Sequence, residues 1–276
     1  MRVFVTGATG YIGSEVVREL ISVGHKVVGL TRSDNGALKL KEARAEVHKG
    51  SLDDLDSLRS GAAIADGVIH LAFKHDFSDF AGSLATDLQA IMAIGEVLEG
   101  TGKPFLTTAH ANGTASDNAT LVLANRGVRA SVVSLSTSVH GDGDKGFVPR
   151  LINIAREKGF SAYIGEGTNR WPAVHRLDAA RLFRLALEAA PAGSKLDGAG
   201  DEGIPFRDIA NVIGRHLNLP VISITRSEAE AHFGFLGPIA ALDIPRSSLQ
   251  TQELLGWKPV HPTLIEDLEQ GHYFDI

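Results

Sequence analysis

The stretch TGATGYIG, Thr6 to Gly13, constrains the fold of this chain more than any other. The β-branched and aromatic run MRVFV precedes it and predicts a buried strand, and apolar residues at helical spacing follow it from Ile12 to Ile21. HKVVGL then predicts a second strand. A strand, a glycine turn, a helix and a strand within about thirty residues are typical of the βαβ unit that binds nucleotides.

Each glycine of this turn has its own physical role. Gly7 permits the tight turn, Gly10 lets the backbone approach a pyrophosphate, and Gly13 allows the helix to pack closely on the strand. The N-terminus of the helix adds unpaired N–H groups and the positive end of a dipole for the phosphates. The cofactor contacts predicted in this turn are Gly7, Thr9, Gly10, Tyr11, Ile12 and Gly13.

Composition excludes several classes of protein. The 276 residues carry a net charge of −6, which argues against nucleic-acid binding because phosphate contacts need clustered Lys and Arg. The chain contains no cysteine, so disulfides, thiolate zinc sites and cysteine nucleophiles are excluded. Neither a signal peptide nor an apolar run long enough to span a membrane is recognisable. We therefore expect a cytoplasmic protein that acts on a small molecule.

Motifs in the same order as in a known family run from Met1 to about Pro259. The GxxGxxG spacing of VTGATGYIG, the segment DGVIHLAF and the later LQTQELLGWKP together resemble the extended branch of the short-chain dehydrogenase/reductase superfamily, which contains sugar-nucleotide epimerases and dehydratases. This resemblance implies an α/β fold with a doubly wound parallel sheet (Rossmann) and a smaller C-terminal substrate lobe. It places a dinucleotide-binding domain at 1–140 and mainly the lobe at 141–276, with segments near 174–202 returning to the first domain.

The end of the second predicted strand bears on the choice between NAD and NADP. An acidic residue commonly binds the adenosine ribose there in NAD-binding proteins. Thr31 takes that place, followed by Arg32 and Ser33, which can bind a 2′-phosphate. The alternative is a solvated Arg32 with Asp34 serving the ribose. We expect NADP, with NAD as the second choice.

The resemblance implies further cofactor contacts beyond the glycine turn. GSL at Gly50 takes the place of the family's GDL, so Ser51 stands where the family has the aspartate that contacts the adenine. HLAF lies at the end of the fourth predicted strand, and STSVHG follows the sixth. The residues implied in these segments are Ser51, Leu52, Leu71, Ala72, Phe73, Ser136 and Val139.

The segment LATDLQAIMAIGEVLEG predicts a buried helix. Its residues at helical spacing are Leu84, Leu88, Ile91, Met92, Gly95 and Leu98. In the family this helix packs on the sheet and often helps to form a dimer. A monomer and a homodimer are both compatible with the sequence.

The catalytic pair typical of the superfamily is missing. Its members commonly use a Tyr as proton donor or acceptor and a Lys four residues later, which lowers the pKa of the Tyr. In the best match, GTASDNATL, Gly113 takes the Tyr position and Asp117 the Lys position. The tyrosines of the chain are Tyr11, Tyr163 and Tyr273, and no lysine lies between Lys103 and Lys145.

Other polar residues near the strand ends are candidates to replace this pair. Thr108, preferred over Thr107, corresponds to the Ser or Thr that orients a carbonyl, and His110 and His75 can exchange protons near neutral pH. Lys74 is a candidate for substrate binding. For any single one of these residues, a solvated polar loop position is the favoured interpretation. We expect no metal, because His70 lies within an apolar strand and no His and carboxylate residues have ligand spacing.

The C-terminal half offers residues for a substrate pocket. Phe147, Pro149, Arg170 and Trp171 are the candidates for its wall, although a single Trp also reads as core packing. Three functions remain open. The first is an atypical oxidoreductase for a small carbonyl or alcohol. The second is an inactive NADP-binding sensor, and the third is a sugar-nucleotide epimerase or dehydratase, which rests on fold analogy.

Overall fold

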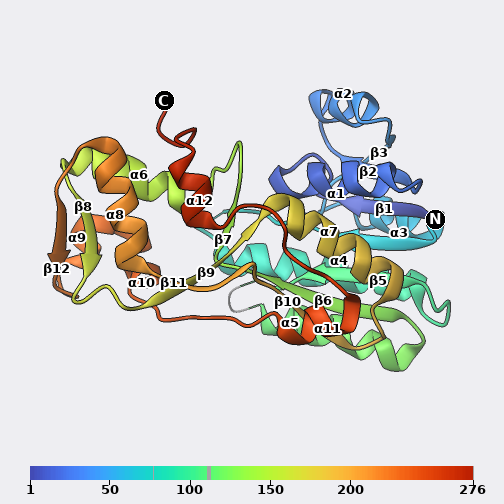
Figure 1. Ribbon diagram of the computed structural model, residues 1–276. Helices are drawn as coiled ribbons and strands as arrows, with labels where there is room; N and C mark the ends of the chain where they lie inside the picture. The colour runs from blue at the N-terminus through green and yellow to red at the C-terminus, as the bar shows by residue number, and fades with distance from the viewer. Residues whose placement is uncertain (77, 111–112, 276) are drawn as a thin grey trace. The chain divides into compact units, whose positions relative to one another are not determined.

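The computed structural model describes residues 1–76, 78–110 and 113–275, and the chain forms two compact units (Figure 1). Unit 1 consists of Met1–Ser134, Ala179–Leu196 and Gln250–Trp257. Unit 2 consists of Leu135–Asp178, Asp197–Leu249 and Lys258–Ile276. Each unit is therefore assembled from three separate segments of the chain.

A seven-stranded sheet in the order β10-β6-β5-β4-β1-β2-β3 forms the centre of unit 1. The adjacent strands from β3 across to β6 all pair in parallel. The strand order reverses between β1 and β4, where Thr6 pairs in register with His70. The predicted doubly wound parallel sheet is thereby confirmed. Its strands are β1 (Arg2–Thr6), β2 (Lys26–Thr31), β3 (Glu46–Lys49), β4 (Gly67–His70), β5 (Pro104–Thr108), β6 (Arg129–Leu135) and β10 (Ser194–Gly198).

Strand alternation explains how helices cover this sheet. Side chains of a strand point alternately to its two faces, so Phe4 of β1 faces one helical layer while Val3 and Val5 face the other. Phe4 packs with Leu58 of α3 and Ile94 of α4 in one buried cluster. The helical segments that begin in unit 1 are α1 (Tyr11–Ser22), α2 (Asp34–Glu42), α3 (Leu55–Ala63), α4 (Phe80–Leu98), α5 (Thr114–Val122) and the 3₁₀ turn η1 (Leu123–Arg126). Two later helices, α7 (Arg176–Ala189) and α11 (Leu249–Leu255), lie mostly in the same unit.

Unit 2 has its own core around Trp171, Phe206 and Ile209. Strand β9 pairs antiparallel with β11 and parallel with β7, while β12 pairs in parallel with β8. Its strands are β7 (Ser138–His140), β8 (Ser161–Ile164), β9 (Arg170–His175), β11 (Asp201–Pro205) and β12 (Val221–Ile224). Its helices are α6 (Phe147–Lys158), α8 (Phe206–Leu217), α9 (Ala229–Phe233), η2 (Gly234–Leu236), α10 (Gly237–Ala240) and α12 (Leu264–Glu269). Among the described residues, no helix of either unit has the length and apolarity needed to cross a bilayer.

Candidate functional site

The glycine turn brings two loops of unit 1 into close contact at the point where the strand order reverses. Gly7 has a φ of +68°, and a Cβ on it would lie 2.7 Å from the backbone nitrogen of Ala72. A Cβ on Gly13 would lie 2.1 Å from the carbonyl oxygen of Gly7. Any larger residue at Gly7 or Gly13 would thus force the backbone apart. The turn is held by contact with the loop that follows β4.

The start of α1 is suited to a negatively charged group. Gly10 is the N-cap of α1 and has no side chain that could bond to the first N–H groups of the helix. The first turn of α1 contains no acidic residue. The N–H groups of a first helical turn have no partner within the helix, and the helix dipole places a partial positive charge there. A phosphate group would satisfy both features.

A cavity of about 650 Å³ opens beside this turn. It brings together most of the predicted cofactor residues, namely Gly7, Thr9, Thr31, Arg32, Ser33, Ser51, Leu52, Ala72 and Phe73, and it is also lined by Lys74 and His75. Four residues of the lining were not predicted, namely Leu30, Gly50, Asp53 and Asp76. The sequence could have indicated these four residues, because each lies within two residues of a predicted site residue. Five predicted residues do not line the cavity: Gly10 is the N-cap of α1, Leu71 lies in the loop after β4, and Tyr11, Ile12 and Gly13 form the first turn of α1.

The end of the cavity at β2 carries an unpaired positive charge. Arg32 is exposed, and its side chain has no hydrogen bond or ion pair with any described residue. Ser33 caps α2 by accepting a hydrogen bond from the N–H of Gly36 at 3.0 Å. Asp34, the alternative ribose ligand, is bound to Lys49 at 2.6 Å, and this contact lowers the pKa of Asp34. The cavity is lined by Arg32 and Ser33 and not by Asp34.

Phe73 links the cavity to two of the predicted proton-transfer residues. The ring of His110 stacks on Phe73 with centroids 4.0 Å apart, and the ring of His75 meets its edge at 5.5 Å. Thr108 lies at the end of β5, and its hydroxyl is 3.5 Å from the carbonyl oxygen of His70, at the limit of a hydrogen bond. Lys74 instead forms an ion pair with Asp53 at 2.5 Å.

Behind His110 lies a buried polar chain that reaches the glycine turn. Nε2 of His110 is 3.7 Å from Oδ1 of Asp87, and the same oxygen is 3.2 Å from Nε2 of His70. Nδ1 of His70 is 2.9 Å from the hydroxyl of Thr6, which also accepts the N–H groups of Leu71 at 3.2 Å and Ala72 at 3.1 Å. Asp87 and His70 are almost fully buried.

The surroundings of His110 and Asp87 determine the charges that these two side chains carry. Burial lowers the pKa of His110, and His70 and His75 act in the same direction, whereas Asp87 opposes the shift. Burial alone would raise the pKa of Asp87, but the contacts with His70, Ser116 and His110 hold it below its usual value. At neutral pH the site therefore contains an ionised carboxylate beside a neutral His110.

The start of α5 has neither the tyrosine nor the lysine of the superfamily pattern. Gly113 is its N-cap, and Asp117 lies in its first turn. Burial raises the pKa of Asp117, and Asp87 adds to this effect while Lys195 opposes it. Where the superfamily has a lysine, which would carry a positive charge, this chain has the carboxyl group of Asp117.

The remaining predicted residues lie in unit 2, where several have structural contacts. Trp171 is fully buried in the core, and Phe147 packs at 6.1 Å from it. Arg170 is exposed and bound to Asp243 through two nitrogens at 3.0 Å. Ser136 donates its hydroxyl to the carbonyl oxygen of Gly198 at 2.9 Å. Val139 lies in the middle of the short strand β7.

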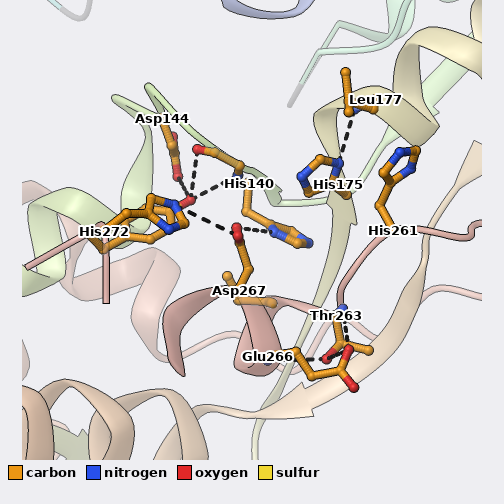
Figure 2. A network of polar contacts seen from close by, with 12 residues as sticks. His140, Asp144, His175, Leu177, His261, Thr263, Glu266, Asp267 and His272 are labelled. Carbon is orange, nitrogen blue, oxygen red and sulfur yellow. Dashed lines mark hydrogen bonds and ion pairs between the residues drawn. The ribbon is translucent and has the colours of Figure 1, made fainter. Parts of the chain in front are cut away.

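Unit 2 contains a second network of histidines and carboxylates (Figure 2). Nδ1 of His140 is 2.8 Å from Asp267, and Nδ1 of His261 is 2.9 Å from Asp178. His175 lies between these pairs, with its ring 5.3 Å from that of His140 and 4.8 Å from that of His261. Burial, together with those two histidines, lowers the pKa of His175 to about 4.

This second network was not anticipated from the sequence, because its members are separated by up to 127 residues. Tyr273 extends it, accepting the N–H of Gly141 at 3.0 Å and contacting Asp144 at 3.1 Å. Despite the number of histidines and acids, the described part of the chain contains no group of three or more of them arranged to hold a metal ion.

Comparisons with known proteins give a family model, relatives in sequence and solved structures that share the fold. Residues 3–96 match the model of the NAD dependent epimerase/dehydratase family. An uncharacterized protein of Schizosaccharomyces pombe is 50% identical over 99% of this chain and 100% of its own length. A 2-alkyl-3-oxoalkanoate reductase of Stenotrophomonas maltophilia is 28% identical over 76% of this chain and 74% of its own length. A solved dTDP-glucose 4,6-dehydratase of Streptomyces venezuelae, with NAD bound, shares the fold with a TM-score of 0.76 at 17% identity, over 99% of this chain and 97% of its own.

Proposed function

Because the chain belongs to the NAD-dependent epimerase/dehydratase family, in the extended branch of the short-chain dehydrogenases/reductases, we propose that it is an NAD(P)-dependent oxidoreductase. Its substrate would be a small carbonyl compound or alcohol, and it would act without the usual Tyr–Lys pair. The similarity to a reductase that acts on a 3-oxoalkanoate supports this substrate class.

The observation that carries the proposal is the cavity at the reversal of strand order. A Cβ at Gly7 would fill the space where its two loops meet, and the N-terminus of α1 is uncapped by any side chain. The residues present therefore fit a dinucleotide, with phosphates at α1 and the adenosine end between Arg32 and Leu52. When bound, the nicotinamide ring supplies or accepts the hydride.

The protein's own contribution would be to hold the substrate oxygen and exchange its proton. His110 is the best candidate for the exchange, because its ring is partly exposed and stacks on Phe73 in the cavity lining. A neutral imidazole can accept the proton of an alcohol, and its protonated form can return one to a carbonyl oxygen. Thr108 would hold the same oxygen by hydrogen bonding.

NADP is the expected cofactor because the cavity offers a free guanidinium where NAD-binding proteins commonly have a carboxylate. A charged hydrogen bond of this kind stabilises binding by about 1.5–3 kcal/mol, or at least tenfold in affinity. We expect Arg32→Ala to weaken NADPH binding by about tenfold or more and to leave NADH binding within about twofold. Fluorescence titration of the purified protein with each nucleotide measures this.

Arg226→Ala is the matched control, because Arg226 is an exposed arginine of unit 2. It should bind both nucleotides like the unsubstituted protein. An equal loss of affinity for NADPH and for NADH in Arg32→Ala would argue against a 2′-phosphate contact. No binding of either nucleotide by the unsubstituted protein would contradict the proposed function itself.

A second candidate function is an NADP-binding sensor without turnover. It is favoured by Gly113 and Asp117, which leave the start of α5 without the superfamily's proton-transfer pair. The two functions differ in one result. An oxidoreductase oxidises NADPH in the presence of one of a panel of small ketones and aldehydes, whereas a sensor binds NADPH and oxidises none of it.

A further inference from the structure

The chain Thr6–His70–Asp87–His110 has a defined order of donors and acceptors. The hydroxyl oxygen of Thr6 already accepts two backbone N–H groups, from Leu71 and Ala72. A hydroxyl has two acceptor positions and one proton, so the Thr6 O–H must be donated to Nδ1 of His70. The proton of a neutral His70 then lies on Nε2 and is donated to Oδ1 of Asp87. Every link up to the carboxylate is thereby fixed.

The carboxylate retains capacity for a further donor. Oδ2 of Asp87 is buried and has no hydrogen bond of ordinary geometry with a described residue, although Ser116 contributes to lowering the pKa of Asp87. The nearest ring nitrogen beyond His70 is Nε2 of His110, 3.7 Å from Oδ1. An ionised carboxylate favours a proton on the nitrogen that faces it. Nδ1 of His110, which has no partner among the described residues, is left to accept a proton.

We infer that Asp87 is the positioning residue of this site, holding His110 with its proton on Nε2 so that Nδ1 is the atom that exchanges protons with the substrate. The inference rests on the proposed function. In the oxidising direction, the alcohol O–H bond breaks and its proton moves to Nδ1, while the hydride of the broken C–H bond would be accepted by the oxidised nicotinamide. In the reducing direction, Nδ1–H gives its proton to the carbonyl oxygen, and the carbonyl carbon would receive the hydride from the reduced nicotinamide. The imidazolium cation formed in between is stabilised by the buried Asp87 carboxylate.

The same chain also links proton exchange to the cofactor turn. Thr6 holds the backbone of Leu71 and Ala72, and the carbonyl carbon of Leu71 and the nitrogen of Ala72 are the atoms closest to a Cβ at Gly7. His70 is therefore a second positioning residue, which fixes Asp87 relative to the loop that lines the cavity. The sequence alone shows these residues in a strand and a helix without any motif that joins them.

The first test measures tautomers in the unsubstituted protein with NADPH added. Nitrogen-15 NMR of the histidine rings distinguishes Nε2–H from Nδ1–H, with His110 assigned by its loss in His110→Gln. We expect Nε2–H for both His70 and His110. A His110 ring protonated on Nδ1 would overturn the inference, and this measurement requires no substitution at Asp87.

The second test uses Asp87→Asn, with Asp87→Glu as the conservative variant. The groups that face His110 are Asp87, His70 and His75, and among these only the carboxylate raises its pKa. Asp87→Asn should therefore lower the pKa of His110 in an NMR titration by about one unit or more. Where a carbonyl is reduced, the fall in rate with rising pH should move to lower pH, and the KM for NADPH should stay within about twofold.

The outcomes separate the inference from the proposed function. A folded Asp87→Asn protein with an unchanged His110 pKa would overturn the inference while NADPH binding and turnover stood. Partial recovery of the pKa and of turnover in Asp87→Glu would support it. The expected tautomer and pKa response without any NADPH binding would overturn the proposed function alone.

Discussion

The two buried networks of histidine and carboxylate differ in what they connect. In unit 1, Asp87 lies between His70, which is buried, and His110, which stacks on the lining of a cavity. In unit 2, Asp267 and Asp178 bind His140 and His261 across 127 and 83 residues of sequence. The first network joins a strand, a helix and a loop around one cavity. The second joins the C-terminal segment to the short sheet of the unit.

The comparison shows that residue type alone does not identify a catalytic pair. Both units place an aspartate that is almost fully buried beside an imidazole ring. The difference is the second ring nitrogen: Nδ1 of His110 belongs to a partly exposed ring, whereas Nε2 of His140 is buried and has no hydrogen bond to a described residue. We therefore expect the unit 2 network to stabilise the fold and the unit 1 network to serve chemistry.

The largest effect on stability should come from breaking the network of unit 2. Asp267→Ala removes the acceptor of His140 at 2.8 Å and leaves that ring buried without a partner. Breaking a buried pair of this kind costs about 3 kcal/mol in the free energy of unfolding. Urea denaturation measures the cost. Asp275→Ala, at an exposed acid nearby, is the control and should stay within about 0.5 kcal/mol.

A smaller effect should follow from pH. His175 has a pKa of about 4 in the folded protein against 6.5 when unfolded, so the unfolded chain binds more protons between these values. Stability should be full above about pH 6.5 and should fall as the pH falls towards 4. We expect a contribution of about 1–2 kcal/mol after allowing for partial exposure of the ring.

The difference between the unsubstituted protein and His175→Gln isolates this contribution. Acids with raised pKa values, such as Asp144 and Asp201, change stability in the opposite direction and are common to both proteins. The two proteins should therefore be compared by urea denaturation at pH 7 and pH 5. An equal loss of stability in both on going to pH 5 would contradict the assignment to His175.

The smallest effect on stability should come from His110. Its ring is partly exposed and lies 3.7 Å from Asp87, too far for a hydrogen bond. His110→Gln should change the free energy of unfolding by less than about 0.5 kcal/mol while reducing turnover by about 100-fold. Thermal denaturation and NADPH oxidation measure the two quantities on one sample. A large loss of stability with turnover intact would reverse the roles assigned to the two networks.

The sequence predicts the sheet and the glycine turn because their signals are local. Strand, turn and helix lie next to one another from Met1 to Thr31, and the predicted doubly wound parallel sheet is confirmed. The helix expected around Leu88 is also present as α4. Its buried face was partly misjudged, since Met92 is 47% exposed and Asp87 is 1% exposed. Hydropathy predicts the reverse, and the contacts of Asp87 with His70, Ser116 and His110 offset the cost of burying its carboxylate.

The sequence could predict only those residues of the candidate site that come shortly after a recognisable strand. Arg32 and Phe73 each follow a recognisable strand, so their places at its end could be expected. Asp87 and His110 are separated by 23 residues and by a whole strand, and no spacing rule brings them together. The same holds for His140 and Asp267, whose contact depends on the packing of α12 against α8 and β9 within unit 2.

The segmented composition of unit 1 has a consequence for its synthesis. Strand β10 covers the edge of β6, yet it follows β6 by about sixty residues, and α11 follows later still. On the ribosome, β6 is therefore an open edge carrying the run Val132–Val133 until residues 194–198 emerge. Open apolar edges pair readily with other chains. The nascent protein is thus vulnerable to aggregation at this edge while residues 136–193, which contain α7 and nearly all of the first segment of unit 2, are being translated.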